Sequence, residues 1–136
     1  MAYPQVTFVN TRLHDGTLIS GRREAAFKNT ASYQLHVLKE TGRYEAFKLG
    51  WHPIYDEKPD VWPVPKHLFW DSDVAKWIEG ACYLLQARPQ PELREAVDEL
   101  VEMIRRAQQP DGYLNIHFTV VEPLKRWTNL RDLHEL

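Results

Sequence analysis

The sequence has one cysteine, six glycines and no excess of basic residues. A single cysteine excludes an internal disulfide and a zinc site built from four cysteines or from two cysteines and two histidines. With 17 Lys and Arg against 19 Asp and Glu, the net charge is −2, and a clustered basic face for nucleic acid is not expected. No apolar run reaches the ~18 residues of a membrane span. We therefore expect neither nucleic acid nor a membrane as a partner.

Several other signals are also missing. The N-terminal residues lack the basic and apolar regions of a secretory signal, so the expected location is cytoplasmic. No glycine-rich phosphate loop and no GxSxG elbow is present. The six histidines show neither HxxxH nor HExxH spacing, so metal ligation by this chain alone is not expected. What remains is a 136-residue chain with 43% hydrophobic residues and five tryptophans, enough for one domain with a core.

The first half of the sequence predicts helix and loop. Strand-forming residues followed by turn formers predict a short N-terminal strand and loop over residues 1–20. A helical pattern follows over residues 21–40, and Gly42 supplies its stop. Four prolines in residues 53–65 exclude a regular helix there. Because disordered segments are poor in aromatic residues, we expect a packed, aromatic- and Pro-rich loop at about residues 50–70.

Two strong helices are predicted after this loop. Apolar residues recur at helical spacing over residues 73–87 and again over residues 91–108, with a Pro-containing break between them. So short a connection predicts an antiparallel helical hairpin. The residues expected at its interface are Val74, Trp77, Ile78, Ala81, Leu85, Leu93, Val97, Leu100 and Ile104. The fold class predicted from the pattern is therefore mainly α.

Two segments follow the hairpin. Residues 113–121 are rich in strand-forming side chains and predict a β-rich run. Thr128 or Asn129 is a candidate N-cap for a further helix that continues to residue 136. That helix would be barely two turns long, and helices of such length are unstable alone.

The first predicted hairpin helix carries the candidates for chemistry. Cys82 lies on its apolar stripe, away from a helix N-terminus and from basic neighbours, and we interpret it as a small buried hydrophobe rather than a nucleophile. Asp71 and Asp73 follow an aromatic pair at the start of the helix. Such carboxylates cap amide groups and complement the helix dipole, but carboxylates beside aromatic rings also suit sugar recognition. The sequence leaves both interpretations open.

Three ordered blocks carry a family resemblance. They are residues 69–79 (FWDSDVAKWIE), 107–115 (AQQPDGYLN) and 126–136 (RWTNLRDLHEL). Together they resemble the β-L-arabinofuranosidase family, glycoside hydrolase family 127. The resemblance implies that residues 1–136 are the N-terminal portion of a catalytic domain. Its fold would be the first helices of an (α/α)6 barrel, a ring of helical hairpins around a central sugar pocket.

The resemblance also implies where the chemistry lies. Family members remove non-reducing-end β-L-arabinofuranose by a retaining mechanism. Their nucleophile is a cysteine held with a glutamate and further cysteines around zinc, and another glutamate is the acid/base. These residues come later than the matched blocks, so we expect no catalytic residue and no metal ligand here, and zinc only in the full-length family. Two substrate-binding positions carry over: Phe69 matches an aromatic lining the sugar pocket, and His134 matches a substrate-contacting histidine.

Three functions remain open at this point. The first is a fragment of a β-L-arabinofuranosidase-like glycoside hydrolase acting on non-reducing-end arabinofuranosyl sugars, inactive alone because a retaining glycosidase needs a nucleophile and an acid/base. The second is a non-catalytic carbohydrate-binding or protein-interaction module. The third is one half of a two-chain hydrolase. Because an incomplete barrel leaves apolar helix faces uncovered, we expect self-association or a partner chain that completes the barrel.

Overall fold

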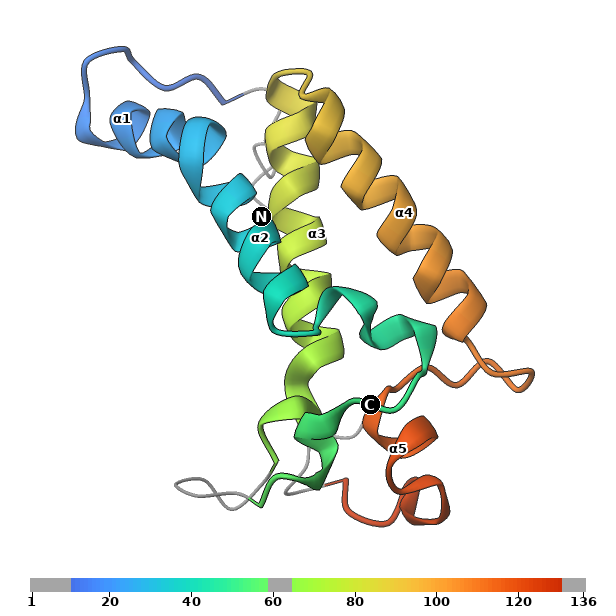
Figure 1. Cartoon of the computed structure of the whole chain (residues 1–136). Helices are drawn as coiled ribbons and strands as arrows, with labels where there is room; N and C mark the ends of the chain where they lie inside the picture. Colours follow the sequence, from blue (N-terminus) through green and yellow to red (C-terminus); the bar gives the residue numbers. More distant parts are fainter. Residues whose placement is uncertain (1–10, 59–64, 131–136) are drawn as a thin grey trace, which may run out of the picture.

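The computed structural model describes residues 11–58 and 65–130. Within these two ranges the chain is mainly helical and contains no strand. The helices are α1 (Leu18–Ala25), α2 (Ala31–Glu40), α3 (Trp70–Ala87), α4 (Pro91–Ala107) and α5 (His117–Val120). Figure 1 shows α3 and α4 as a long hairpin, with α2 on the other side of α3. In the part of the chain that is described, no helix is both long and apolar enough to cross a bilayer.

The helix predicted over residues 21–40 is confirmed, but it starts earlier and is not regular. Thr17 caps it by accepting a 3.1 Å hydrogen bond from the Ser20 amide. Between α1 and α2 the chain passes through a π-helical turn, Ala26–Thr30. Such turns hold an extra residue and re-aim the side chains that follow. This turn buries Phe27, and the Arg88 guanidinium lies 4.3 Å from the Phe27 ring centroid.

The predicted hairpin is confirmed. Pro91 begins α4, where its fixed φ suits the first turn, and Arg88 closes α3. Val74 and Leu100 are completely buried where the two helices meet. A 3-10 turn, Tyr44–Lys48, packs against α4 and completes this core. The core therefore lies along the hairpin, with α2 and the turn after it as a third layer.

The aromatic- and Pro-rich loop is packed, as predicted, over the part that is described. It contains the 3-10 turns Pro53–Asp56 and Lys66–Phe69, and it buries Tyr55. Its approach to α2 is close: a Cβ at Gly42, which has φ +82°, would lie 2.6 Å from the His52 ring nitrogen Nε2. Glycine is therefore required at this turn for space as well as for conformation.

The strands predicted from the sequence are wrong where the structure describes them, and other predictions lie outside the described residues. Residues 113–121 are not β-rich in structure, because their centre winds into the short helix α5. The Asn115 side chain accepts a 2.9 Å hydrogen bond from the Phe118 amide, which starts this turn despite the strand-forming composition. Residues 11–17 form no strand, while residues 1–10 and the last predicted helix over 131–136 lie outside the described residues.

The interpretation of Cys82 as a buried residue is also wrong, since Cys82 is exposed. The buried line of α3 runs through Val74, Trp77 and Ala81, at spacings of three and four residues. Cys82 follows that line by one residue, which turns it about 100° around the helix. It lies in a shallow groove between α3 and α4, beside Val97.

We expect Leu100→Ala to lower the free energy of unfolding by ~2–5 kcal/mol, because Leu100 is fully buried at the hairpin interface. Val101→Ala, on the same helix, is the matched control: Val101 is 51% exposed, so its truncation should change stability by less than ~0.5 kcal/mol. Urea titration followed by circular dichroism measures both. Equal effects of the two substitutions would contradict this packing.

Candidate functional site

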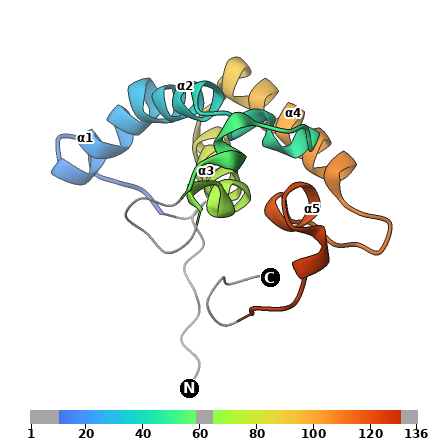
Figure 2. The same ribbon diagram turned by 60° about the horizontal axis from the view of Figure 1, so that its bottom comes forward.

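One end of the hairpin gathers the loops of the chain. The 3-10 turn Lys66–Phe69 leads into α3 there, and residues 109–130 return to the same place after α4. Figure 1 shows this end at the bottom, and Figure 2 brings it forward with α5 beside the start of α3. The sequence-predicted residue Phe69 lies at this end, as the residue just before α3.

The described structure places Phe69 in an aromatic cluster. Its side chain is partly buried and packs against the side chains of Leu68, Tyr113 and Phe118. We call these three residues the aromatic cluster. The cluster joins the two segments that meet at this end. His134, the other predicted substrate-binding residue, lies outside the described residues.

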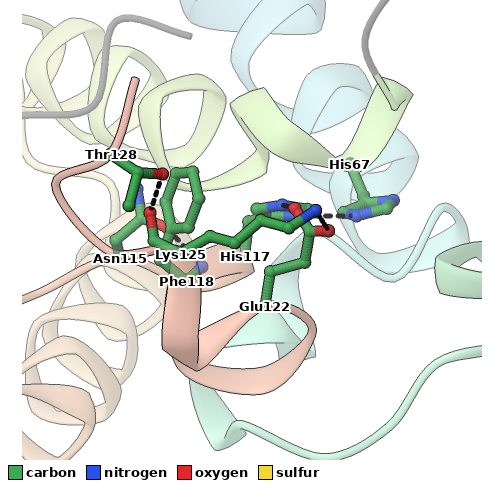
Figure 3. Close-up of polar contacts among 7 residues, drawn as sticks. All are labelled: His67, Asn115, His117, Phe118, Glu122, Lys125 and Thr128. Carbon is green, nitrogen blue, oxygen red and sulfur yellow. Dashed lines mark hydrogen bonds and ion pairs between the residues drawn. The ribbon is translucent and has the colours of Figure 1, made fainter. Parts of the chain in front are cut away.

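Two buried histidines form the centre of a polar network beside this cluster. His67 is 2% exposed and His117 is 3% exposed. Their ring centroids are 5.1 Å apart at an interplanar angle of 29°, and His67 Nε2 lies 2.9 Å from His117 Nδ1. On its other side, His117 Nε2 lies 3.1 Å from Glu122, whose second oxygen accepts a 2.5 Å hydrogen bond from Lys125. Figure 3 shows these four side chains and their contacts.

The network determines where the protons lie. The hydrogen bond from Lys125, followed by that from His117, lowers the pKa of Glu122, which is therefore a carboxylate at neutral pH. A carboxylate accepts only, so His117 Nε2–H donates to it. In the neutral His117 ring this tautomer leaves Nδ1 unprotonated, so that Nδ1 accepts from His67 Nε2–H. Burial, helped by the neighbouring His117, lowers the pKa of His67 to about 4, so His67 is neutral.

The two carboxylates at the start of α3 point to different partners. Helix α3 begins at Trp70, so neither Asp71 nor Asp73 is its N-cap residue. Asp71 accepts hydrogen bonds from the Ser72 amide (2.9 Å) and, across the gap between segments, from the Ile116 amide (3.2 Å). Burial raises the pKa of Asp71 against the effect of these two amides. It is a structural link between the segments.

Asp73 takes part in a different feature, a groove between α2 and α3. Its carboxylate forms a 3.0 Å ion pair with Arg43. The groove is open, with a volume of about 640 Å³, and Tyr33, Lys76 and Trp77 also line it. The two aspartates therefore do not form one sugar-binding cluster.

The segment after α5 is fixed by a second set of contacts. Arg126 lies 3.5 Å from the centroid of the Tyr113 ring and forms a 2.7 Å ion pair with Asp111. Trp127 packs edge-on against Tyr113, at 4.9 Å between centroids, and has φ +64°. Positive φ is uncommon for a bulky residue and marks a tightly determined backbone. These contacts fix the backbone of the described segment around Trp127.

Comparisons with known proteins decide the family. Residues 11–136 match the family described as "Beta-L-arabinofuranosidase, GH127 catalytic domain". The chain belongs to glycoside hydrolase family 127. A curated relative, the non-reducing end β-L-arabinofuranosidase of Bifidobacterium longum subsp. longum, is 40% identical over 73 residues, which are 51% of this chain and 11% of that relative.

A solved GH127 structure has the same fold over this region. It is a β-L-arabinofuranosidase from Geobacillus stearothermophilus T6, matched with a TM-score of 0.71 and 35% identity over 88% of this chain and 19% of that one. The chain thus spans less than a fifth of the solved relative. The match and the helical structure confirm the prediction of a mainly α fold that is part of an (α/α) barrel.

The zinc site implied by family resemblance does not fit the described residues. Over residues 11–58 and 65–130, no three His, Cys, Asp or Glu side chains are grouped so that they could hold a metal ion. Cys82, the one cysteine of the sequence, lies on the outer side of the hairpin in a groove with Arg94 and Asp98. No chemical step can be derived through a metal held by these residues alone.

Sequence reasoning missed the histidine pair. The two residues are separated by 50 positions and share no motif. The only signal was weak: His67 stands two residues before the block that starts at Phe69, and His117 lies in the apolar run after the hairpin. Their contact depends on how residues 109–122 fold back on the start of α3, which the sequence pattern does not contain.

We expect stability to decrease as the pH falls from about 6.5 to about 4, because unfolded His67 binds a proton in this range while folded His67, with a pKa of about 4, does not. One such group contributes at most about 1.4 kcal/mol per pH unit. Urea titrations at several pH values should show a shallower dependence for His67→Phe than for the wild-type chain. His36→Gln, which alters an exposed histidine, is the control; equal slopes in all three proteins would contradict the assignment.

Proposed function

We propose that this chain is the N-terminal portion of a β-L-arabinofuranosidase-like catalytic domain that acts on non-reducing-end arabinofuranosyl sugars. The observation that carries the proposal is the family match over residues 11–136, which includes all of the described structure. The activity in the names of the two relatives agrees with it. The cytoplasmic location expected from the sequence stays a prediction.

In this proposal, the loop-rich end of the hairpin forms part of the wall of the sugar pocket. Phe69 offers the exposed part of its ring to the apolar C–H face of the sugar, the mode in which aromatic side chains bind carbohydrate. Its remaining surface is supported by the aromatic cluster. His134, four residues beyond the last described residue, is the proposed polar partner for sugar hydroxyl groups.

The proposal assigns hydrolysis to residues beyond these 136. A retaining glycosidase needs a nucleophile and an acid/base on either side of the scissile bond. The described carboxylates near Phe69 are already engaged, since Asp71 holds the Ile116 amide and Glu122 holds His117 and Lys125. Cys82 lies in the α3/α4 groove with Val97, away from the loop-rich end.

We therefore expect purified residues 1–136 not to hydrolyse an aryl β-L-arabinofuranoside, with or without added zinc. Placing residues 11–136 in the Geobacillus relative, in exchange for its matching segment, should give an active chimera. In that chimera Phe69→Ala should raise KM for the aryl glycoside, while Leu124→Ala, at a side chain that is 96% exposed, should not. Release of the aryl group measures all of these proteins.

Two results would contradict this assignment. Turnover by the isolated chain that is abolished by Cys82→Ser would make Cys82 a nucleophile and place catalysis inside these residues. A chimera that melts cooperatively but does not hydrolyse the substrate would show that this segment does not serve the same reaction as its relatives.

The open groove between α2 and α3 supports a second part of the proposal, that this surface is covered in the working protein. Tyr33 is 67% exposed at the groove, and on α1 Leu18 and Ile19 are 78% and 64% exposed. Burial of exposed apolar surface contributes about 25 cal/mol per Å², so covering these side chains favours association. We propose that further barrel helices, a partner chain or a second copy covers the groove.

We expect the isolated chain to self-associate at micromolar concentration and to bind a hydrophobic dye, as measured by sedimentation and fluorescence. Tyr33→Glu should shift it towards monomer, because a charge in the groove opposes burial. Leu124→Glu is the control, since Leu124 is exposed but does not line the groove. A compact wild-type monomer with a sharp melt and no dye binding would contradict the proposal and favour a self-sufficient binding module.

A further inference from the structure

Two segments that are far apart in the sequence are joined by one pair of buried side chains. His67 lies in the 3-10 turn that ends at Phe69, and His117 is the first residue of α5. Their 2.9 Å hydrogen bond joins the segments beside the aromatic cluster. The hydrogen bond from the Ile116 amide to Asp71 joins them a second time, at the start of α3. Phe69 lies between His67 and Asp71, the two residues of its segment that form these links.

We propose that His67 and His117 are positioning residues for Phe69, and that their hydrogen bond sets how the Phe69 ring faces the sugar. This inference rests on the proposed function, because there Phe69 is a sugar-binding side chain. The aromatic cluster covers only part of the Phe69 ring. Apolar packing is non-directional, whereas a hydrogen bond has a preferred distance and angle. The histidine pair therefore supplies the directional constraint that the cluster lacks.

The surroundings of the pair make this constraint strong. The Tyr55 ring meets His67 edge-on at 4.8 Å between centroids, and the Phe118 ring meets His117 at 4.7 Å and 90°. Water is thus kept away from both imidazoles. Among the described residues, the Tyr55 hydroxyl and the Trp70 indole N–H are buried beside the pair without a protein hydrogen-bond partner. If a ring without an N–H group replaces the His67 imidazole, His117 Nδ1 is left buried without its hydrogen-bond donor.

Glu122 determines the direction of the hydrogen bond. By accepting from His117 Nε2–H, it fixes Nδ1 as the acceptor for His67. The exposed Lys125 side chain donates to the other oxygen of Glu122, as Figure 3 shows. The charged or titratable groups around the pair are thus Glu122, Lys125 and the phenol of Tyr55. The hydrogen bond needs one proton between His67 Nε2 and His117 Nδ1. A second proton there would place two N–H groups against each other and break the hydrogen bond.

The first experiment tests the hydrogen bond itself, on the full chain labelled with ¹⁵N-histidine. We expect both histidines as Nε2–H tautomers, with a ¹⁵N–¹⁵N coupling between His67 Nε2 and His117 Nδ1 at neutral pH. Glu122→Gln, which removes the charge, should weaken the preference of His117 for this tautomer. The absence of the coupling in the wild-type chain would overturn the proposal without any variant.

The second experiment tests positioning. Nuclear Overhauser contacts between the Phe69 ring and the rings of Tyr113 and Phe118 should be lost in His67→Phe, which keeps an aromatic ring but removes the donor. His67→Gln should restore them, because its side-chain amide offers N–H at a similar distance from the backbone. His36→Gln, at an exposed histidine, is the control and should change nothing.

Two outcomes of the second experiment would overturn the proposal. If His67→Phe and wild type show the same contacts, apolar packing alone holds Phe69. If His67→Phe and His67→Gln lose them equally, ring shape and not the hydrogen bond is decisive. Where His67→Phe does not fold, the coupling and the recovery in His67→Gln still decide the question.

Titration with methyl β-L-arabinofuranoside separates this inference from the proposed function. We expect the Phe69 resonances to shift in the wild-type chain and in His67→Gln, and this shift to be lost in His67→Phe. A wild-type chain with the coupling and the ring contacts but without any sugar-induced shift would count against the proposed function and leave the positioning of Phe69 intact. Equal sugar-induced shifts in all three proteins would contradict the positioning role.

Discussion

The burial of Trp70 is the constraint on which the rest of this end of the structure depends. Trp70 is fully buried at the first position of α3, where His52, Tyr55 and His67 surround its ring at centroid distances of 5.2, 5.8 and 6.4 Å. The Arg43 guanidinium covers it from the end of α2 at 5.6 Å. A side chain of this size dominates local packing, so the chain from α2 to α3 is arranged around it.

The order around Trp70 extends to the segment after α4. Because α3 starts in a fixed place, Asp71 can hold the Ile116 amide, and His67 can hold His117. The loop-rich end is therefore a scaffold with two polar links and an aromatic cluster between them. Functional side chains on loops are effective when a rigid scaffold positions them, and Phe69 is placed in this way.

The helical hairpin could be predicted from the sequence because its information is local. Apolar residues at spacings of three and four and the break at Pro91 are enough to define α3 and α4. The spacing of apolar residues defines the centre of a buried helix face better than its edges. Cys82 lies at such an edge, so the sequence predicts it to be buried although it is exposed. Residues 113–121 were assigned by composition, but Asn115 and Asp71 provide hydrogen bonds that favour a turn. Contacts between distant segments, such as the histidine pair, have no local pattern and could not be predicted.

We infer that the end of the hairpin that carries Phe69 is ordered before any sugar binds. Amide hydrogen exchange tests it most directly, because the Ile116 amide is bound to Asp71 and not to a helix partner. We expect the Ile116 amide to exchange about as slowly as amides in the middle of α4, such as that of Leu100. Exchange of Ile116 at the rate of a solvent-exposed loop, with Leu100 still protected, would contradict the account.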